Sequence, residues 1–165
     1  MYRGMLAGTV VAMGLAGCAP QEAPVSAAAT VDTAAVVAGV NELWTRWSAA
    51  DVAGDTEALI ALSTPAIRMD AMGSAPIVGH DAARAAWTPI FQATDYTEAT
   101  ITPEMTVAVT NELAHSMGKY FSRFTANGRA GAEYGRYVAA AVKGADGQWR
   151  AAYIMAMLDS TVTAK

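Results

Sequence analysis

The side chains that most often bind metals or act as nucleophiles are scarce in this sequence. His80 and His115 are its two histidines, and neither has a carboxylate at the spacing of metal ligands. Neither has a serine or cysteine partner that indicates a nucleophile, and Cys18 is the single cysteine. The glycine-rich residues 128–135 follow a predicted strand without opening a helix, so they are not typical of a phosphate-binding loop. We therefore expect no metal and no cofactor, which leaves carboxylates to carry any chemistry.

Cys18 ends a segment that has the order of an export signal. Arg3 precedes an apolar run from Met5 to Met13, which is shorter than the roughly 20 residues that span a bilayer. The run leads into Leu15-Ala16-Gly17-Cys18, which resembles the lipobox of bacterial lipoproteins, where cleavage precedes a cysteine that carries the lipid. We therefore divide the chain into a signal peptide (1–17), a lipidated cysteine with a flexible tether rich in Ala, Pro and Ser (18–31), and a domain (32–160).

This resemblance implies a place in the bacterial cell envelope, attached to the membrane through the lipid alone. No aspartate follows Cys18, so sorting to the outer membrane, facing the periplasm, is favoured. Loss of Arg3 with the signal peptide changes the net charge from −4 to −5. No stripe of lysine or arginine is present, and we expect no nucleic-acid partner.

The first part of the domain has the apolar spacing of helices. Asp32 precedes a segment in which apolar residues recur every three or four positions, at Val36, Val40, Leu43, Trp44 and Trp47. Gly54 and Asp55 indicate the end of this helix and the cap of a second, short one. A short hairpin is predicted at 67–78, and a third helix after Gly79, with a kink or an early end at Pro89.

After Asp95 the apolar residues alternate, which is typical of half-buried strands. Strands are predicted at 101–109, 114–126, 131–143 and 148–159, with hairpin turns at Asn127-Gly128 and Asp146-Gly147. Helices followed by a run of antiparallel strands indicate an α+β domain.

This order of elements, together with local motifs, resembles the nuclear-transport-factor-2-like and ketosteroid-isomerase-like superfamily, and most closely its SnoaL-like group. The motifs, spread over about residues 36–159, are AADVAGDTEALIAL ending at Leu62, PIVG at 76–79, NELA at 111–114, GRYV at 135–138 and DGQWR at 146–150. The resemblance implies three N-terminal helices packed on a strongly curved antiparallel sheet, with a cone-shaped pocket between them.

The resemblance also singles out Asp70 as a candidate acid/base residue. The segment Ala66–Gly73 is similar to the one that carries the general base of ketosteroid isomerases, and Asp70 falls on the base position. A carboxylate in an apolar pocket would have a raised pKa, which improves it as a base near neutral pH. A solvent-exposed aspartate at a strand end is the alternative. Trp47 stands at the family's tyrosine position and Gly135 near its second aspartate, so the steroid isomerase mechanism is disfavoured.

The alignment with that family implies an apolar pocket into which a few polar side chains point. Its predicted lining consists of Trp44 and Trp47 from the first helix and, by the facing of the strand residues, Met117, Lys119, Phe121, Glu133, Tyr137 and Ile154. A one-residue shift of register would turn the strand residues outward. We expect the four tryptophans, as a set, to pack in the core and not to form a ligand-binding surface.

Two classes of function follow from these observations. The first is an envelope-anchored domain that binds a small apolar or amphipathic molecule. The second is a lyase, isomerase or hydrolase that uses Asp70 without a cofactor, and an interaction module is a third possibility. On the last strand Tyr153, Met155 and Met157 alternate with Ala152, Ile154 and Ala156, so both faces are apolar. This pattern predicts a homodimer packed sheet to sheet.

Overall fold

The computed structural model describes residues 30–163, so the predicted signal peptide, Cys18 and residues 18–29 of the tether lie outside the described residues. The described chain forms three helices and six strands. In chain order they are α1 (Thr33–Ala53), α2 (Thr56–Ala61), β1 (Ser63–Ala71), β2 (Ile77–Val78), α3 (Gly79–Ala93), β3 (Thr94–Ala108), β4 (Leu113–Ala126), β5 (Arg129–Lys143) and β6 (Trp149–Thr163).

Helix α1 begins and ends where its capping residues predict. The Asp32 carboxylate accepts a hydrogen bond from the backbone N–H of Ala35 at 3.0 Å. Gly54 ends the helix with a φ of 62°, a left-handed conformation that glycine adopts without steric cost. None of the helices in residues 30–163 is both long enough and apolar enough to cross a membrane.

Helix α3 contains Pro89 and still continues to Ala93, so the predicted early end is wrong. Proline removes one backbone donor without ending a helix whose other turns are held by packing. Of its residues, Ala83 is fully buried, while Trp87 and Phe91 pack against the core.

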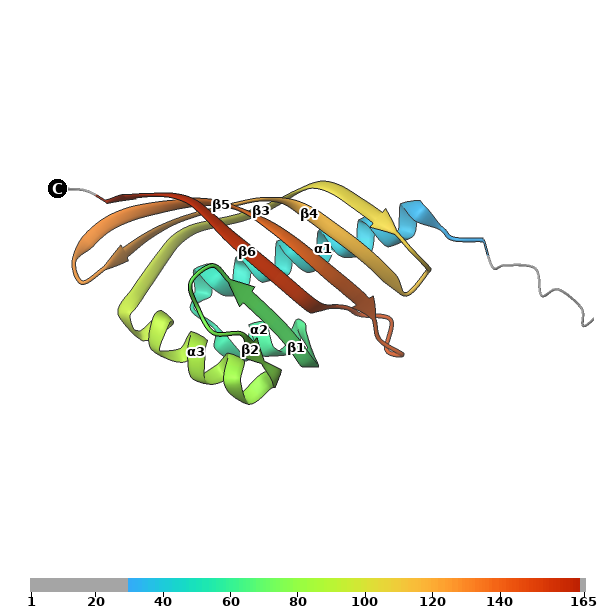
Figure 1. Ribbon diagram of the computed structural model, residues 1–165, viewed down its shortest axis with the longest axis horizontal. Helices are drawn as coiled ribbons and strands as arrows, with labels where there is room; N and C mark the ends of the chain where they lie inside the picture. The colour runs from blue at the N-terminus through green and yellow to red at the C-terminus, as the bar shows by residue number, and fades with distance from the viewer. Residues whose placement is uncertain (1–29, 164–165) are drawn as a thin grey trace, which may run out of the picture.

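The six strands form one sheet in the order β2-β1-β6-β5-β4-β3, which curves over α1 while α2 and α3 lie beside β1 and β2 (Figure 1). Strands β3 to β6 form antiparallel hairpins, as predicted. Strand β1 pairs with β6 in parallel, Met69 lying opposite Ile154, so the sheet is mixed and not wholly antiparallel. The chain crosses from β1 to the far edge of the sheet through α3, which allows this parallel pairing.

The core lies between α1 and the concave face of the sheet. The apolar positions that predicted the α1 face are buried there, namely Val36, Val40, Leu43, Trp44 and Trp47. The indole of Trp44 donates to Ser116 Oγ at 3.1 Å, and Ser116 shares a 2.9 Å hydrogen bond with the Tyr137 hydroxyl. These hydrogen bonds satisfy the polar groups of large side chains that would otherwise be buried without partners.

Candidate functional site

The two faces of the sheet are distinguished by the register of β4. Ser116 is fully buried against Trp44, and it is followed on the same concave face by Gly118 and Tyr120. Met117, Lys119 and Phe121, the residues between them, therefore lie on the convex face, so their predicted facing was wrong by one residue. The concave face of β4 carries small residues at Ala114, Ser116 and Gly118 because α1 and the backbone of β3 approach it closely.

Asp70 is also on the convex face. Its carboxylate accepts two hydrogen bonds from the Arg68 guanidinium, both at 2.9 Å. Arg68 therefore holds the pKa of the Asp70 carboxyl below its ordinary value, and the Tyr153 hydroxyl acts in the same direction. The predicted raised pKa is thus corrected to a lowered one. An ion-paired carboxylate of this kind is a poor proton acceptor near neutral pH.

Three of the predicted lining residues belong to the core. Trp44, Trp47 and Tyr137 are buried, and their rings pack against one another with the Trp44 centroid 5.9 Å from that of Trp47 and 5.2 Å from that of Tyr137. Ile154 also faces the concave side and packs against this core. Glu133 faces the same side but lies farther along β5, where it is only half-buried.

Around Glu133, half-buried polar and aromatic side chains from α1, α3 and three strands come together. We call the set Asp51, Phe91, Tyr96, Tyr120, Phe124 and Glu133 the acidic–aromatic cluster. The Tyr96 ring lies 5.8 Å from that of Phe91 and 6.0 Å from that of Phe124. Each of the six residues retains some solvent exposure, so the cluster is accessible from outside.

Two glycines of β5 make room for the rings of this cluster. A Cβ at Gly135 would collide with the ring of Tyr120, and one at Gly131 would lie 2.7 Å from Cζ of Phe124. The missing side chains let both rings lie flat across β5 on its concave face. In this position the Tyr120 hydroxyl lies within the field of Glu133 and Asp159, and it acts in turn on Tyr96.

The two carboxylates of the cluster lack counter-charges. Within residues 30–163 neither Asp51 nor Glu133 forms an ion pair, and burial alone raises the pKa of each carboxyl, that of Asp51 to about 7. Burial also raises the pKa of Tyr96 to about 12, with the charges of Glu133 and Asp51 adding to the effect. The tyrosine hydroxyl therefore lies within the field of both carboxylates.

A carboxyl group whose pKa is about 7 is suited to proton transfer, because both of its protonation states are populated near neutral pH. Among the residues that the structure describes, no three His, Cys, Asp or Glu side chains gather where they could hold a metal ion. The chemistry available to the cluster is thus hydrogen bonding, charge attraction and proton transfer.

Sequence reasoning missed Asp51. It stands four residues after Trp47, which places it on the same face of α1 as the buried tryptophans. A carboxylate one turn after Trp47 on an apolar helix face therefore indicated a buried acidic group, and this could have been read from the sequence. The family alignment directed attention to Asp70 instead.

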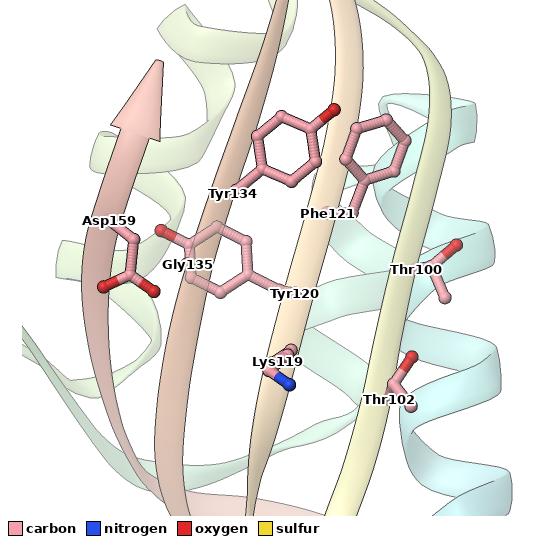
Figure 2. A pocket seen from close by; sticks show the side chains of 8 residues that line it. All are labelled: Thr100, Thr102, Lys119, Tyr120, Phe121, Tyr134, Gly135 and Asp159. Atoms are coloured by element: carbon pink, nitrogen blue, oxygen red, sulfur yellow. The ribbon is translucent and has the colours of Figure 1, made fainter.

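The convex face contains a second candidate, a hollow of about 330 Å³. Figure 2 shows its lining side chains, from Thr100 and Thr102 on β3 to Asp159 on β6, with the Phe121 and Tyr134 rings close together. Its charged groups already have partners, since Lys119 pairs with Glu104 and Asp159 with Arg136. A ligand here would have to break existing ion pairs, which makes this hollow the weaker candidate.

A third hollow, of about 600 Å³, lies between α2, α3 and the start of β6. His80 Nε2 lies 3.3 Å from the Ser63 carbonyl oxygen, and Arg150 is bound to Asp146 at 2.7 Å. Its polar groups, too, are satisfied by their neighbours. The acidic–aromatic cluster differs from both hollows, because its two carboxylates form no ion pair within the described chain and its rings are half-buried.

The curved sheet wrapped around a long first helix, with α2 and α3 at one edge, defines the nuclear-transport-factor-2-like fold, and this prediction is confirmed. A ketosteroid isomerase-like protein from Erwinia carotovora atroseptica matches at a TM-score of 0.64 and 19% identity, over 77% of this chain and 95% of that one. A cystatin-like-fold protein of this class from Novosphingobium aromaticivorans matches at 0.59 and 17%, over 76% and 82%.

A hexachlorocyclohexane dehydrochlorinase has a TM-score of 0.68 at 11% identity, over 80% of this chain and 90% of its own. No family model and no curated protein matches the sequence. At identities this low the likeness establishes the fold, and function has to be argued from the side chains of this chain.

Proposed function

We propose that this domain binds a small organic molecule at the acidic–aromatic cluster. The observation that carries the proposal is Asp51, a largely buried carboxyl group with no ion-pair partner in residues 30–163, beside half-exposed aromatic rings. Burying such a group without a partner costs free energy. A ligand that supplies Asp51 with a hydrogen bond or an opposite charge would offset this cost.

Capture of the natural ligand tests this proposal. Protein purified from its native host, washed and then denatured, should release a small molecule detectable by mass spectrometry. The Asp51→Asn variant should release less of it, while the Glu98→Gln variant, altered on the convex face, should release as much as wild type. Equal recovery from wild type and Asp51→Asn would place the ligand elsewhere.

Acid/base catalysis without a cofactor is the second candidate, with Asp51 in place of Asp70. The raised pKa of Asp51 favours it, because a base poised near neutral pH accepts and returns a proton readily. An isomerase or lyase step needs such a transfer from a carbon atom of the substrate. Deuterium exchange into the captured ligand in D2O, lost in Asp51→Asn, would distinguish a catalyst from a binding domain.

We also propose that the domain is held at the bacterial cell envelope by a lipid on Cys18, with the outer membrane as its destination. The Leu15-Ala16-Gly17-Cys18 sequence supports this proposal. Wild-type protein should fractionate with membranes and carry acyl chains, whereas Cys18→Ser should yield a soluble or unprocessed form. Intact-mass spectrometry checks this, and an unmodified Cys18 thiol in the native host would contradict it.

The third part of the proposal is a homodimer formed through the convex face. Met155 and Met157 lie there with the exposed side chains of Met105, Met117 and Val138. Charged residues on this face form four internal ion pairs, Arg68–Asp70, Lys119–Glu104, Arg123–Glu98 and Arg136–Asp159. These pairs balance eight charges of the face with one another, which reduces repulsion between two copies of an acidic protein.

Met157→Glu should convert this dimer into a monomer, because the new carboxylate would be buried without a partner. Light scattering at micromolar concentration measures the change. Val52→Glu, at an exposed position of α1, is the matched control and should leave the dimer intact. A wild-type protein that is monomeric under these conditions rules the dimer out.

A further inference from the structure

We propose that the ligand of the acidic–aromatic cluster is an organic cation, a protonated amine or quaternary ammonium group carried on an apolar body. This inference rests on the proposed function and specifies its ligand class. Two features of the cluster carry it, namely carboxylates without counter-charges and aromatic rings that border them.

The charge balance around the cluster is the first feature. Asp51 and Glu133 both point to the concave side, and both act on Tyr96 through their charge. Arg123 and Arg136 lie on the convex face and already pair with Glu98 and Asp159, and no basic side chain of the described chain acts on the pKa of Asp51 or Glu133. No basic side chain of residues 30–163 therefore neutralises the two carboxylates, and a cationic ligand would do so.

The aromatic rings are the second feature. Phe91, Tyr96 and Phe124 come from α3, β3 and β4, and adjacent ring centroids lie 5.8 and 6.0 Å apart. Aromatic faces attract ammonium groups that lie within about 6 Å of the ring centroid, and each of these three rings is partly exposed to solvent. The Tyr120 ring crosses Gly135 with its hydroxyl toward Asp159 (Figure 2), and the charge of Glu133 acts on that hydroxyl as well.

Other ligand classes fit these features less well. An anion would be repelled by both carboxylates once they are ionised. A divalent metal ion needs more oxygen ligands than two carboxylates supply, and rings are poor replacements for them. A neutral molecule would leave the negative charge of Glu133 uncompensated.

Binding of a cation should strengthen as the pH rises from 6 to 8, because Asp51 loses its proton over this range. Of the titratable groups in the cluster, Tyr96 on β3 is the one whose pKa the charge of Asp51 affects, and Glu133 on β5 acts on both Tyr96 and Tyr120. Both tyrosines stay neutral over this range because burial raises their pKa. The pH dependence should therefore be that of the carboxylates.

Three probes that share a benzyl or phenyl body test the ligand class by calorimetry on the purified full chain. Benzyltrimethylammonium should bind at least about tenfold more tightly than neutral benzyl alcohol or anionic benzoate. Asp51→Asn and Glu133→Gln should each weaken binding of the cation about tenfold without changing the affinity for benzyl alcohol. Glu98→Gln, which removes a paired carboxylate on the convex face, is the matched control and should bind like wild type.

Equal affinity for the cation and the alcohol would overturn the inference, as would binding of Ca²⁺ or Mg²⁺ in place of the ammonium probe. If benzyl alcohol binds and its amide shifts in NMR map to Tyr96, Tyr120 and Phe124, the cluster is a binding site for neutral molecules. That result would leave the proposed function standing. Failure of all three probes and of ligand capture would overturn both.

Discussion

The Asp51→Asn variant is expected to be more stable than wild type above pH 7, although it lacks a candidate functional group. The pKa of Asp51 is about 7 in the folded domain, against 3.8 for the ordinary group. The folded state therefore holds a proton that the unfolded chain has released, so the free energy of unfolding falls as pH rises from about 4 to about 7. This difference in pKa corresponds to a loss of up to about 4 kcal/mol in the free energy of unfolding of wild type. The neutral amide of the Asp51→Asn variant would largely avoid that loss.

Urea denaturation at a series of pH values measures this effect. Wild type should lose stability between pH 4 and 7 and change little above, while Asp51→Asn should keep only a much smaller slope, the part that comes from the raised pKa of Glu133. Asp95→Asn, at an exposed position of β3, is the control and should keep the wild-type slope. A wild-type protein whose stability rises over this range would show that Asp51 is not desolvated.

The Gly118→Ala variant is expected to lose about 3 kcal/mol or more of unfolding free energy. A Cβ at Gly118 would collide with the carbonyl oxygen of Thr102 and lie 2.8 Å from the Glu104 nitrogen and 3.0 Å from Pro103 Cα. All three atoms belong to the backbone of β3, at the bulge between Pro103 and Met105. Backbone held in a hydrogen-bonded ladder cannot move aside as a side chain does, so the two strands would have to separate locally.

Gly144→Ala is the matched control for this substitution. Its added methyl group would approach only side-chain atoms of Arg150 and Asp146, which are free to rotate away. Denaturation midpoints should therefore drop sharply for Gly118→Ala and slightly for Gly144→Ala. Similar midpoints for Gly118→Ala and wild type would mean that β3 is far more compliant here than its pairing indicates.

Much of the fold was readable from the sequence because local signals and tertiary structure agree. Asp32, Gly54 and Asp55 cap the first two helices as predicted, and Asn127-Gly128 and Asp146-Gly147 are the predicted hairpin turns. The parallel pairing of β1 with β6 was not predicted, because the apolar alternation of Ile67 and Met69 is the same whichever strand pairs with β1. Which strand lies beside them depends on the path of the whole chain.

The site was harder to predict, because hydrophobicity does not fix which face of β4 is buried. Met117 and Phe121 are more apolar than Ser116 and Gly118, yet the smaller residues face α1. Space decides here, since the Trp44 indole and the backbone of β3 leave no room for long side chains. On β5 the buried Tyr137 lies on the face that the alignment implied. On that strand the hydrophobicity of the side chains and the space available to them favour the same face.

The pairing of β1 with β6 also constrains the order in which the domain can be completed during synthesis. Ser63 lies opposite Ala151 and Met69 opposite Ile154, so β1 and β2 join the rest of the sheet only through β6, the last of the six strands in chain order. Until residues 149–163 have emerged, β1 and β2 have no sheet to join, and their apolar side chains remain open to solvent. Contacts between residues far apart in the sequence, such as those of β1 with β6, form slowly. A nascent or truncated chain therefore offers the unpaired edge of β1 to proteases and to other unfolded chains.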